Sequence, residues 1–187
     1  FITIGITAQT DQESIQQTAE GYMVHVQNND IEQILDAMLP QLFEVVDKNQ
    51  MKMSMEQMFN NPDMKVEYLS AKINSISNTV KNENTKYALV NYDSSFKMIF
   101  LTEAKKPMDE RTEMLDYFKT AMETQFGAGS VTINYDEASV SVKSTTNMYA
   151  VSSPEFKGWK FLNDDENMGQ LTKSIIPELV IEQLKNQ

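Results

Sequence analysis

The side chains best suited to acid–base or ligand chemistry are two tyrosines, one serine and the only histidine of the chain. Tyr22 and His25 lie three residues apart within a helical periodicity, so they neighbour each other on a helix surface. Tyr92 and Ser94 fall on the apolar face of the longest strand pattern. If that helix packs on that face, the four converge, and a tyrosine–histidine pair there orients a ligand or transfers a proton. The alternative interpretation places both tyrosines in the core and the histidine at the surface.

A methionine-rich stretch is the second chemical feature. Met51, Met53, Met55 and Met58 form the pattern M-x-M-x-M-x-x-M, which resembles the methionine-rich segments of exported copper-handling proteins. Thioether sulfur is a soft ligand that suits Cu(I). On a helix, Met51, Met55 and Met58 share a face while Met53 points away. Methionine stripes also fill cores and form adaptable contact surfaces, so a partner surface is the competing interpretation.

Several kinds of catalytic site are excluded by residues that the chain lacks. With no cysteine there is no thiol nucleophile, disulfide or thiolate metal site, and a single histidine argues against catalytic zinc. The chain contains no G-x-S-x-G elbow, no P-loop and no G-x-G-x-x-G. The acidic run that begins at Asn163 fails as an EF-hand, because its sixth residue is Met168 and its twelfth is Ser174. The sequence therefore predicts neither a cofactor nor a metal, and favours a chain that is not an enzyme.

Charge and hydropathy restrict the partners. The 187 residues include 27 acidic and 16 basic side chains, a formal charge of -11. Such a surface repels phosphate backbones and anionic lipid, so we expect no nucleic-acid partner. No stretch approaches the roughly 18 consecutive apolar residues of a membrane-spanning helix, so no membrane insertion of the mature chain is expected.

Residues 1–9 allow two interpretations. Phe1 to Thr7 resembles the end of a signal-peptide apolar region, with a cleavage point near Gln9. The isoleucines of this segment also alternate, as in a short strand. The first interpretation, which we favour, predicts export to the periplasm or the extracellular space. Residues 10–187 are then a single domain, for which the length is suitable.

Helical signals open this domain. Thr10 and Glu13 form a capping box at the start of a helix whose apolar residues recur at spacings of three and four. Asp30 begins a second run, which Pro40 interrupts, and a short helical piece covers 54–60. Because these faces are amphipathic, we expect the helices to cover a sheet.

Strand patterns follow over 64–77 and 88–100, then over the two arms of a hairpin, 131–135 and 140–142, and over 158–162. The hairpin turns at 136–137, and its second strand extends toward 151. A change of parity predicts a bulge near Leu69, and 81–84 reads as a polar turn. One helix is expected from its cap at Asp109 to Phe126, and another from a cap at Asn167, broken at Pro177. The sequence therefore predicts an α+β fold: N-terminal amphipathic helices packed on a curved antiparallel sheet of about five strands, with an inserted helix and a C-terminal helix.

This order resembles the nuclear-transport-factor-two-like group, within the cystatin-like α+β folds. Residues 158–161, Gly-Trp-Lys-Phe, are similar to the closing strand of many such domains, and the resemblance covers Asp11 to Asp164. It implies a conical cavity between helices and sheet. Some members are isomerases or dehydratases, with an acidic base and a tyrosine donor in those that isomerise steroids, and others are binding or scaffolding modules. The helix over 109–126 and the C-terminal helix depart from the pattern, and no catalytic residue carries over.

The leading hypothesis is an exported, non-catalytic domain that binds a small apolar ligand or a protein partner. Its basis is that strong catalytic signatures are missing while the fold signals are clear. The first alternative is a cofactor-free enzyme of the isomerase or dehydratase type, with a pocket between the first helix and the sheet. Its candidate groups are Tyr22, His25, Tyr92 and Asp93. The second alternative is the methionine-based copper binder.

Overall fold

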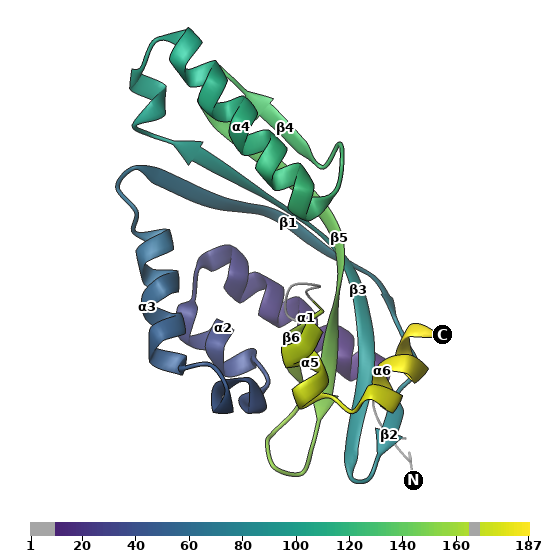
Figure 1. Cartoon of the computed structure of the whole chain (residues 1–187). Helices are drawn as coiled ribbons and strands as arrows, with labels where there is room; N and C mark the ends of the chain where they lie inside the picture. The colour runs from purple at the N-terminus through teal and green to yellow at the C-terminus, as the bar shows by residue number, and fades with distance from the viewer. Residues whose placement is uncertain (1–9, 165–168) are drawn as a thin grey trace, which may run out of the picture.

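The computed structural model describes residues 10–164 and 169–187, which form an α+β fold. Figure 1 shows a long, curved sheet with helices packed at both of its ends. The predicted class and arrangement, with helices before the sheet, between its strands and after it, are confirmed. Residues 1–9, predicted as a signal-peptide remnant or short strand, lie outside the described residues. The same holds for Asn167, the predicted cap of the C-terminal helix.

The helices lie in three groups along the chain. The first group is α1 (Asp11–Asn28), α2 (Ile31–Ala37), the 3-10 turn η1 (Pro40–Glu44) and α3 (Lys48–Phe59). Between the strands lie the 3-10 turn η2 (Glu103–Lys105) and α4 (Met108–Phe126), and after them α5 (Gly169–Ile175) and α6 (Glu178–Lys185). The predicted capping box is present: the Glu13 amide donates to Thr10 Oγ1 at 3.2 Å, and the Thr10 amide donates to Glu13 Oε2 at 2.9 Å.

The sheet is built around two long strands. Its members are β1 (Met64–Ile76), β2 (Val80–Asn82), β3 (Thr85–Phe100), β4 (Val131–Asn134), β5 (Ser139–Ser152) and β6 (Lys160–Asn163). β3 and β5 pair antiparallel without a register shift, from Lys86 with Ser152 to Ile99 with Ser139. β1 and β2 attach to the other side of β3, while β4 and β6 attach to opposite ends of β5.

Alternation along β3 assigns its side chains to two faces, which we call the even and odd faces after their residue numbers. At one end of the even face, Ala88 and Val90 pack with Ile15 of α1. At the other end, Met98 packs with Leu115 of α4. Because the β3–β5 register is unbroken, α1 and α4 cover the two ends of one face. The predicted row of apolar residues of one parity is therefore confirmed.

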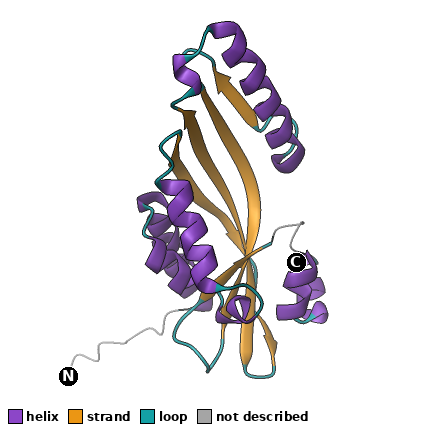
Figure 2. Ribbon diagram, turned by 60° about the vertical axis from the view of Figure 1, so that its left-hand side comes forward, coloured by secondary structure: helices purple, strands orange, loops and turns teal. Residues whose placement is uncertain are grey.

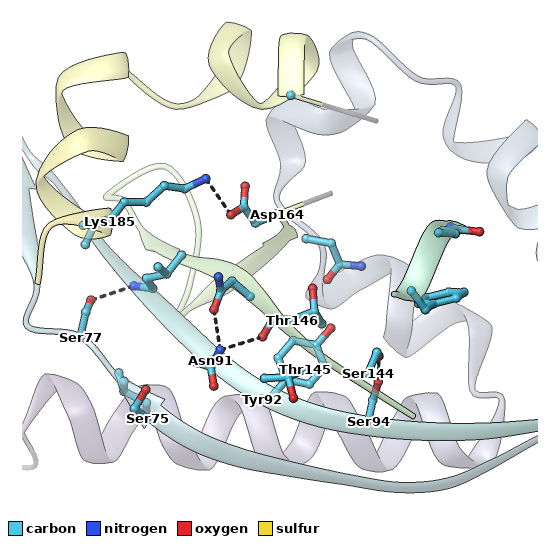
Figure 3. Close-up of a pocket in the computed structure, with 18 of the residues that line it drawn as sticks. Ser75, Ser77, Asn91, Tyr92, Ser94, Ser144, Thr145, Thr146, Asp164 and Lys185 are labelled. Carbon is cyan, nitrogen blue, oxygen red and sulfur yellow. Dashed lines mark hydrogen bonds and ion pairs between the residues drawn. The ribbon is translucent and has the colours of Figure 1, made fainter. Parts of the chain in front are cut away.

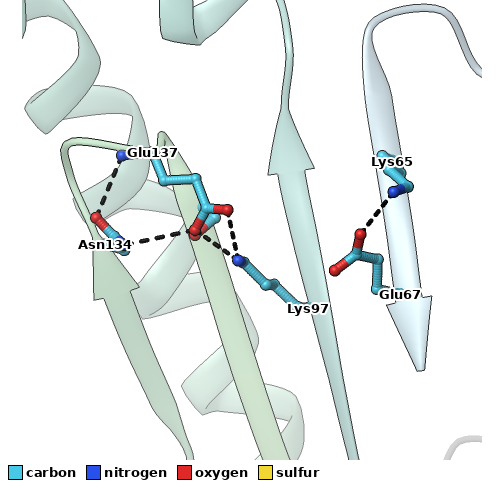
Figure 4. Close-up of polar contacts among 6 residues, drawn as sticks. Lys65, Glu67, Lys97, Asn134 and Glu137 are labelled. Carbon is cyan, nitrogen blue, oxygen red and sulfur yellow. Dashed lines mark hydrogen bonds and ion pairs between the residues drawn. The ribbon is translucent and has the colours of Figure 1, made fainter. Parts of the chain in front are cut away.

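Among the described residues, helices cover the odd face only near one end. There Leu89 packs on a cluster that includes Ile176 and residues of α6. Figure 2 shows the N-terminal helices and the α5–α6 pair on opposite sides of the strands. Farther along, the odd face is polar, and Lys97 Nζ lies 2.5 Å from Glu137 Oε2 near the β4–β5 turn (Figure 4). That ammonium group is the main cause of the lowered pKa of Glu137.

The structure corrects several predicted boundaries. Asp109 lies in the first turn of α4, because Pro107 holds the N-cap position. α3 begins at Lys48, ahead of the predicted 54, behind a cap in which Asp47 accepts a hydrogen bond from the Gln50 amide. Asp30 occupies the N-cap of α2 but makes no side-chain cap hydrogen bond.

The β1 bulge and the break at Pro177 agree with the sequence prediction, and β2 is an additional strand. The β1–β3 register shifts between Tyr68 and Ser70, which confirms the bulge predicted near Leu69. Pro177 separates α5 from α6, as expected of a residue without an amide hydrogen. In the part of the chain that the structure describes, the sheet has six strands where about five were predicted, because Val80–Asn82 pairs with β3 and confines the predicted polar turn to 83–84.

Arg111 holds two loops together at the α4 end of the sheet. Its Nη2 donates to the carbonyl oxygens of Ala104 and Lys106 at 2.6 and 2.9 Å. Its Nη1 donates to those of Tyr135 and Asp136 at 3.1 and 3.0 Å. The planar guanidinium presents several donors in fixed directions, which suits four acceptors from two segments. Arg111 therefore joins the segment before α4 to the β4–β5 turn, while Leu115 and its neighbours pack α4 on the sheet.

We predict that Arg111→Met lowers the free energy of unfolding by about 1–3 kcal/mol, because four carbonyl groups lose their donor. Arg111→Lys should recover part of the loss, since a single ammonium group cannot reach all four acceptors. The exposed Glu113 of the same helix provides the control, as Glu113→Met. Chemical denaturation measures the difference. Equal midpoints for Arg111→Met and the control would contradict the prediction.

Candidate binding groove

An open groove of about 1540 Å³ crosses the middle of the sheet. It is lined by residues of β3 and β5 from both faces, by the C-terminal turn of α4 and by residues of α6 and its neighbours (Figure 3). The groove exists because α1 and α4 cover only the ends of the even face, and α6 covers only one end of the odd face. Small-molecule sites usually measure about 300–1,000 Å³, so this volume indicates room for a larger, extended ligand.

On the even face, the groove has aromatic walls and a small polar floor. The Ser94 and Ser144 hydroxyl oxygens lie 3.0 Å apart, across β3 and β5. The Phe96 ring packs against Tyr68 of β1 and Phe126 of α4, with ring centroids 6.2 and 5.8 Å away. Because the two serines are small, the rings border open space. This side of the groove can therefore accept an apolar side chain.

On the odd face, the groove is lined by amides and hydroxyls and by the ion pair of Lys185 Nζ with Asp164 Oδ2 at 2.9 Å (Figure 3), and a second carboxylate, Asp93, lies beside the lining residue Thr145. Asn91 Nδ2 donates to Asn147 Oδ1 at 2.9 Å. Asp93 Oδ1 accepts from Thr145 Oγ1 at 2.6 Å and from Asn74 Nδ2 at 2.9 Å. These two hydrogen bonds, with that of Thr145 the stronger cause, lower the pKa of Asp93. The exposed Asp93 is thus a fixed negative charge beside β5.

Between these two faces, β5 has an edge stretch with which no strand in residues 10–164 and 169–187 pairs. We call this stretch the open edge of β5. Its pairing with β4 ends at Val142, and its pairing with β6 begins at Met148. The Lys143 amide donates to Ser130 O at 2.9 Å, and Asn147 O accepts from the Asp164 amide at 3.0 Å. Alternate residues of a strand direct their main-chain groups to the same side. The N–H and C=O of Thr145 therefore point outward from β5 into the groove, and no described strand pairs with residues 144–146 there.

The structure brings two of the four predicted site residues into the groove. Tyr92 and Ser94 line it. Tyr22 instead lies in the cluster beneath α1, stacked on Phe161 with ring centroids 5.4 Å apart. His25 lies on the flank of α1, where its Nδ1 is 3.2 Å from Asp30 Oδ2. Tyr22 and His25 thus do not act as a pair within the groove.

The tyrosine hydroxyls near α1 are poor proton acceptors. Burial raises the pKa of Tyr22 well above its usual value, and the nearby phenols of Tyr92 and Tyr68 raise it further. Burial also raises the pKa of Tyr68 and of Tyr92. At neutral pH these groups remain protonated and can only donate or accept hydrogen bonds. A general base needs a pKa near the working pH, and these phenols do not supply one.

The methionine-rich segment forms α3, none of whose residues is fully buried. Met51 packs against the core cluster beneath η1, and Met53 is 58% exposed. Met55 and Met58 are half-buried. Copper binding through Met51, Met55 and Met58 stays a prediction. Within residues 10–164 and 169–187, no group of three or more histidine, aspartate or glutamate side chains is arranged to hold a metal ion.

No protein-family model, curated protein or solved structure matches this chain. The resemblance to the nuclear-transport-factor-two-like group therefore remains a prediction, and functional inference rests on the groove. None of the helices that the structure describes has the length and apolar character needed to cross a bilayer.

Sequence reasoning missed the groove residues contributed by β5 and α4, namely Ser144, Thr145, Thr146 and Phe126. One signal for them was present. Ser94 interrupts the apolar row of β3, and Ser144 interrupts the corresponding row of β5, which continues at Val142 and Met148. Two small polar residues at matching positions of paired strands indicate a place where no helix packs.

Removing the Tyr22 hydroxyl, as in Tyr22→Phe, should change how the free energy of unfolding depends on pH in the alkaline range. The pKa of Tyr22 is raised in the folded state, so its stabilising contribution is present below the unfolded value of about 10 and is lost as pH rises beyond it. We therefore expect the free energy of unfolding to fall less between about pH 9 and pH 11 in Tyr22→Phe than in the wild type. Tyr117→Phe is the control, because it also removes one phenol but at a position that is 74% exposed. Identical pH profiles for Tyr22→Phe and wild type would contradict the assignment.

The hydrogen bond from Thr145 can be tested through Asp93. We predict that Thr145→Val moves the pKa of the Asp93 carboxyl upward, toward its usual value, because the strongest hydrogen bond to the ionised form is lost. Since the pKa of Asp93 is depressed, the stability linked to it is present above about pH 4 and is lost as pH falls. Carbon-13 NMR of the carboxyl group measures the titration, with Thr146→Val as the neighbouring control. A titration midpoint for Asp93 unchanged by Thr145→Val would rule out the proposed cause.

Proposed function

We propose that this chain is a non-catalytic binding domain for a protein partner, and that the groove across β3 and β5 is its binding site. One observation carries the proposal: the groove is open, larger than usual small-molecule sites, and lined on two faces by side chains of different chemistry. A protein segment can contact both faces at once. A small apolar ligand would use only the aromatic side, which makes it the second candidate.

An enzymatic role has less support from the geometry. The candidate bases fail for different reasons. His25 pairs with Asp30 away from the groove, and the phenol of Tyr92 has a raised pKa. Asp93 lies beside the groove, bonded to the lining residue Thr145, and its hydrogen bonds hold its pKa below the usual value, which weakens it as a base at neutral pH. The groove therefore offers hydrogen-bonding and packing groups rather than an activated acid–base pair.

The experiment is a selection of random heptapeptides displayed on phage against the immobilised full chain, with a parallel selection against Ser94→Trp. The indole fills the space above the serine floor, so we expect the enriched peptides to lose most of their binding to this variant. Ser70→Trp, on an exposed position of β1 outside the groove, is the matched control and should retain binding. Circular dichroism and cooperative unfolding establish that both variants fold.

Peptides that bind Ser94→Trp as well as wild type would overturn the groove as the site. Enrichment of no peptide, together with small apolar compounds that shift the NMR signals of Tyr68 and Phe96, would favour the second candidate.

A further inference from the structure

We infer that the partner binds as an extended polypeptide segment that pairs, as an added strand, with the open edge of β5 at Thr145. This inference rests on the proposed function and specifies how the groove would be used. It depends on main-chain hydrogen bonding rather than on the apolar lining alone. The segment would lie between β4 and β6 and complete the row of pairing along β5.

The main-chain groups of Thr145 are the basis of this inference. They point outward from β5, as shown by the hydrogen bonds of Lys143 and Asn147 on either side. The N–H and C=O of Thr145 match one residue of another extended chain. That residue supplies a C=O to the Thr145 N–H and an N–H to the Thr145 C=O. This is the chemistry of strand addition at a sheet edge.

The two faces of the groove then fix the side-chain pattern of the segment. The residue opposite Thr145 would place its side chain on the odd face, near the Asp93 carboxylate. A basic side chain there complements the Asp93 carboxylate, which accepts from two neutral groups and has Lys72 as its cross-strand neighbour on β1, in a chain whose formal charge is -11. Its two neighbours would point to the even face, toward the rings of Phe96 and Phe126. The bound segment would therefore have an apolar residue on each side of a basic residue.

The shape of the edge favours a single strand over a second copy of this chain. The open stretch covers only residues 144–146, about 10 Å of strand, and lies recessed between β4 and β6. A second β5 edge would bring its own β4 and β6 into the same space. The opposite edge of the sheet is less suited to pairing, because β1 carries two register shifts and exposes Lys65 and Lys72.

The test uses the acetylated and amidated pentapeptide Ser-Phe-Lys-Phe-Ser, titrated into nitrogen-15-labelled full-length chain. We expect saturable shifts at the amide of Thr145 and its neighbours. The same peptide methylated on the lysine amide nitrogen loses the donor to the Thr145 carbonyl, and should bind at least about tenfold more weakly. Replacement of the central lysine by glutamate should also weaken binding, because it faces Asp93.

Two protein variants complete the test. Thr145→Pro removes the outward N–H and, with the hydroxyl, the side-chain hydrogen bond to Asp93, but it leaves the main-chain hydrogen bonds to β3 in place, and an edge position tolerates proline. It should weaken binding by at least about tenfold, and by clearly more than Thr145→Val, which loses the same hydroxyl but keeps the N–H. Should Thr145→Pro fail to fold, the methylated peptide tests the same hydrogen-bonded pair on unaltered protein.

The outcomes separate the two proposals. Equal binding of the methylated peptide, or no binding of any pentapeptide at millimolar concentration, overturns strand addition. Groove-dependent peptides from the displayed library would still support the proposed function in that case. If a chain shortened to begin at Thr10 binds the pentapeptide and the full chain does not, residues 1–9 occupy the edge and a separate partner is ruled out. Concentration-dependent dimerisation that the pentapeptide reverses would make a second copy the occupant instead.

Discussion

The unbroken antiparallel pairing of β3 with β5 is the constraint on which the rest of the structure depends. It runs from Lys86 with Ser152 to Ile99 with Ser139. Because side chains alternate along both strands, this single register decides which residues face α1 and α4 and which face α5 and α6. A slip of one residue would expose Val90 and Met148 and bury Asp93. The mixture of apolar and polar residues along these strands therefore specifies one register strongly.

The same pairing explains why the middle of the molecule is open. β5 has 14 residues, whereas β4 and β6 have four each and attach at its opposite ends. The helices are similarly divided, since α1 and α4 pack on separate clusters of the even face. Neither end depends on the other for its packing. The groove is thus a consequence of two separate cores that share two long strands, rather than of a cavity within one core.

Much of this arrangement was predictable from local patterns. The capping box at Thr10, the apolar parity of β3 and the break at Pro177 all follow from short-range chemistry that the sequence displays directly. The candidate site was only partly predictable, because periodicity gives the face of a helix and not its position along the sheet. Tyr22 faces the sheet as expected, but it lies over Phe161 rather than beside Ser94. His25, three residues later, is rotated by about 300° around the helix axis, which places it on the flank.

The two free edges of the sheet limit pairing with other chains in different ways. A long free edge is a template for pairing with any extended chain, and β1 has such an edge. Its bulges, at Tyr68–Ser70 and Ile73–Ser75, interrupt the regular spacing of its main-chain groups. β5 is protected differently: its open stretch keeps regular spacing but is too short and too recessed for another sheet to reach. Pairing there is restricted to a single narrow chain, so access rather than hydrogen-bonding capacity provides the selectivity.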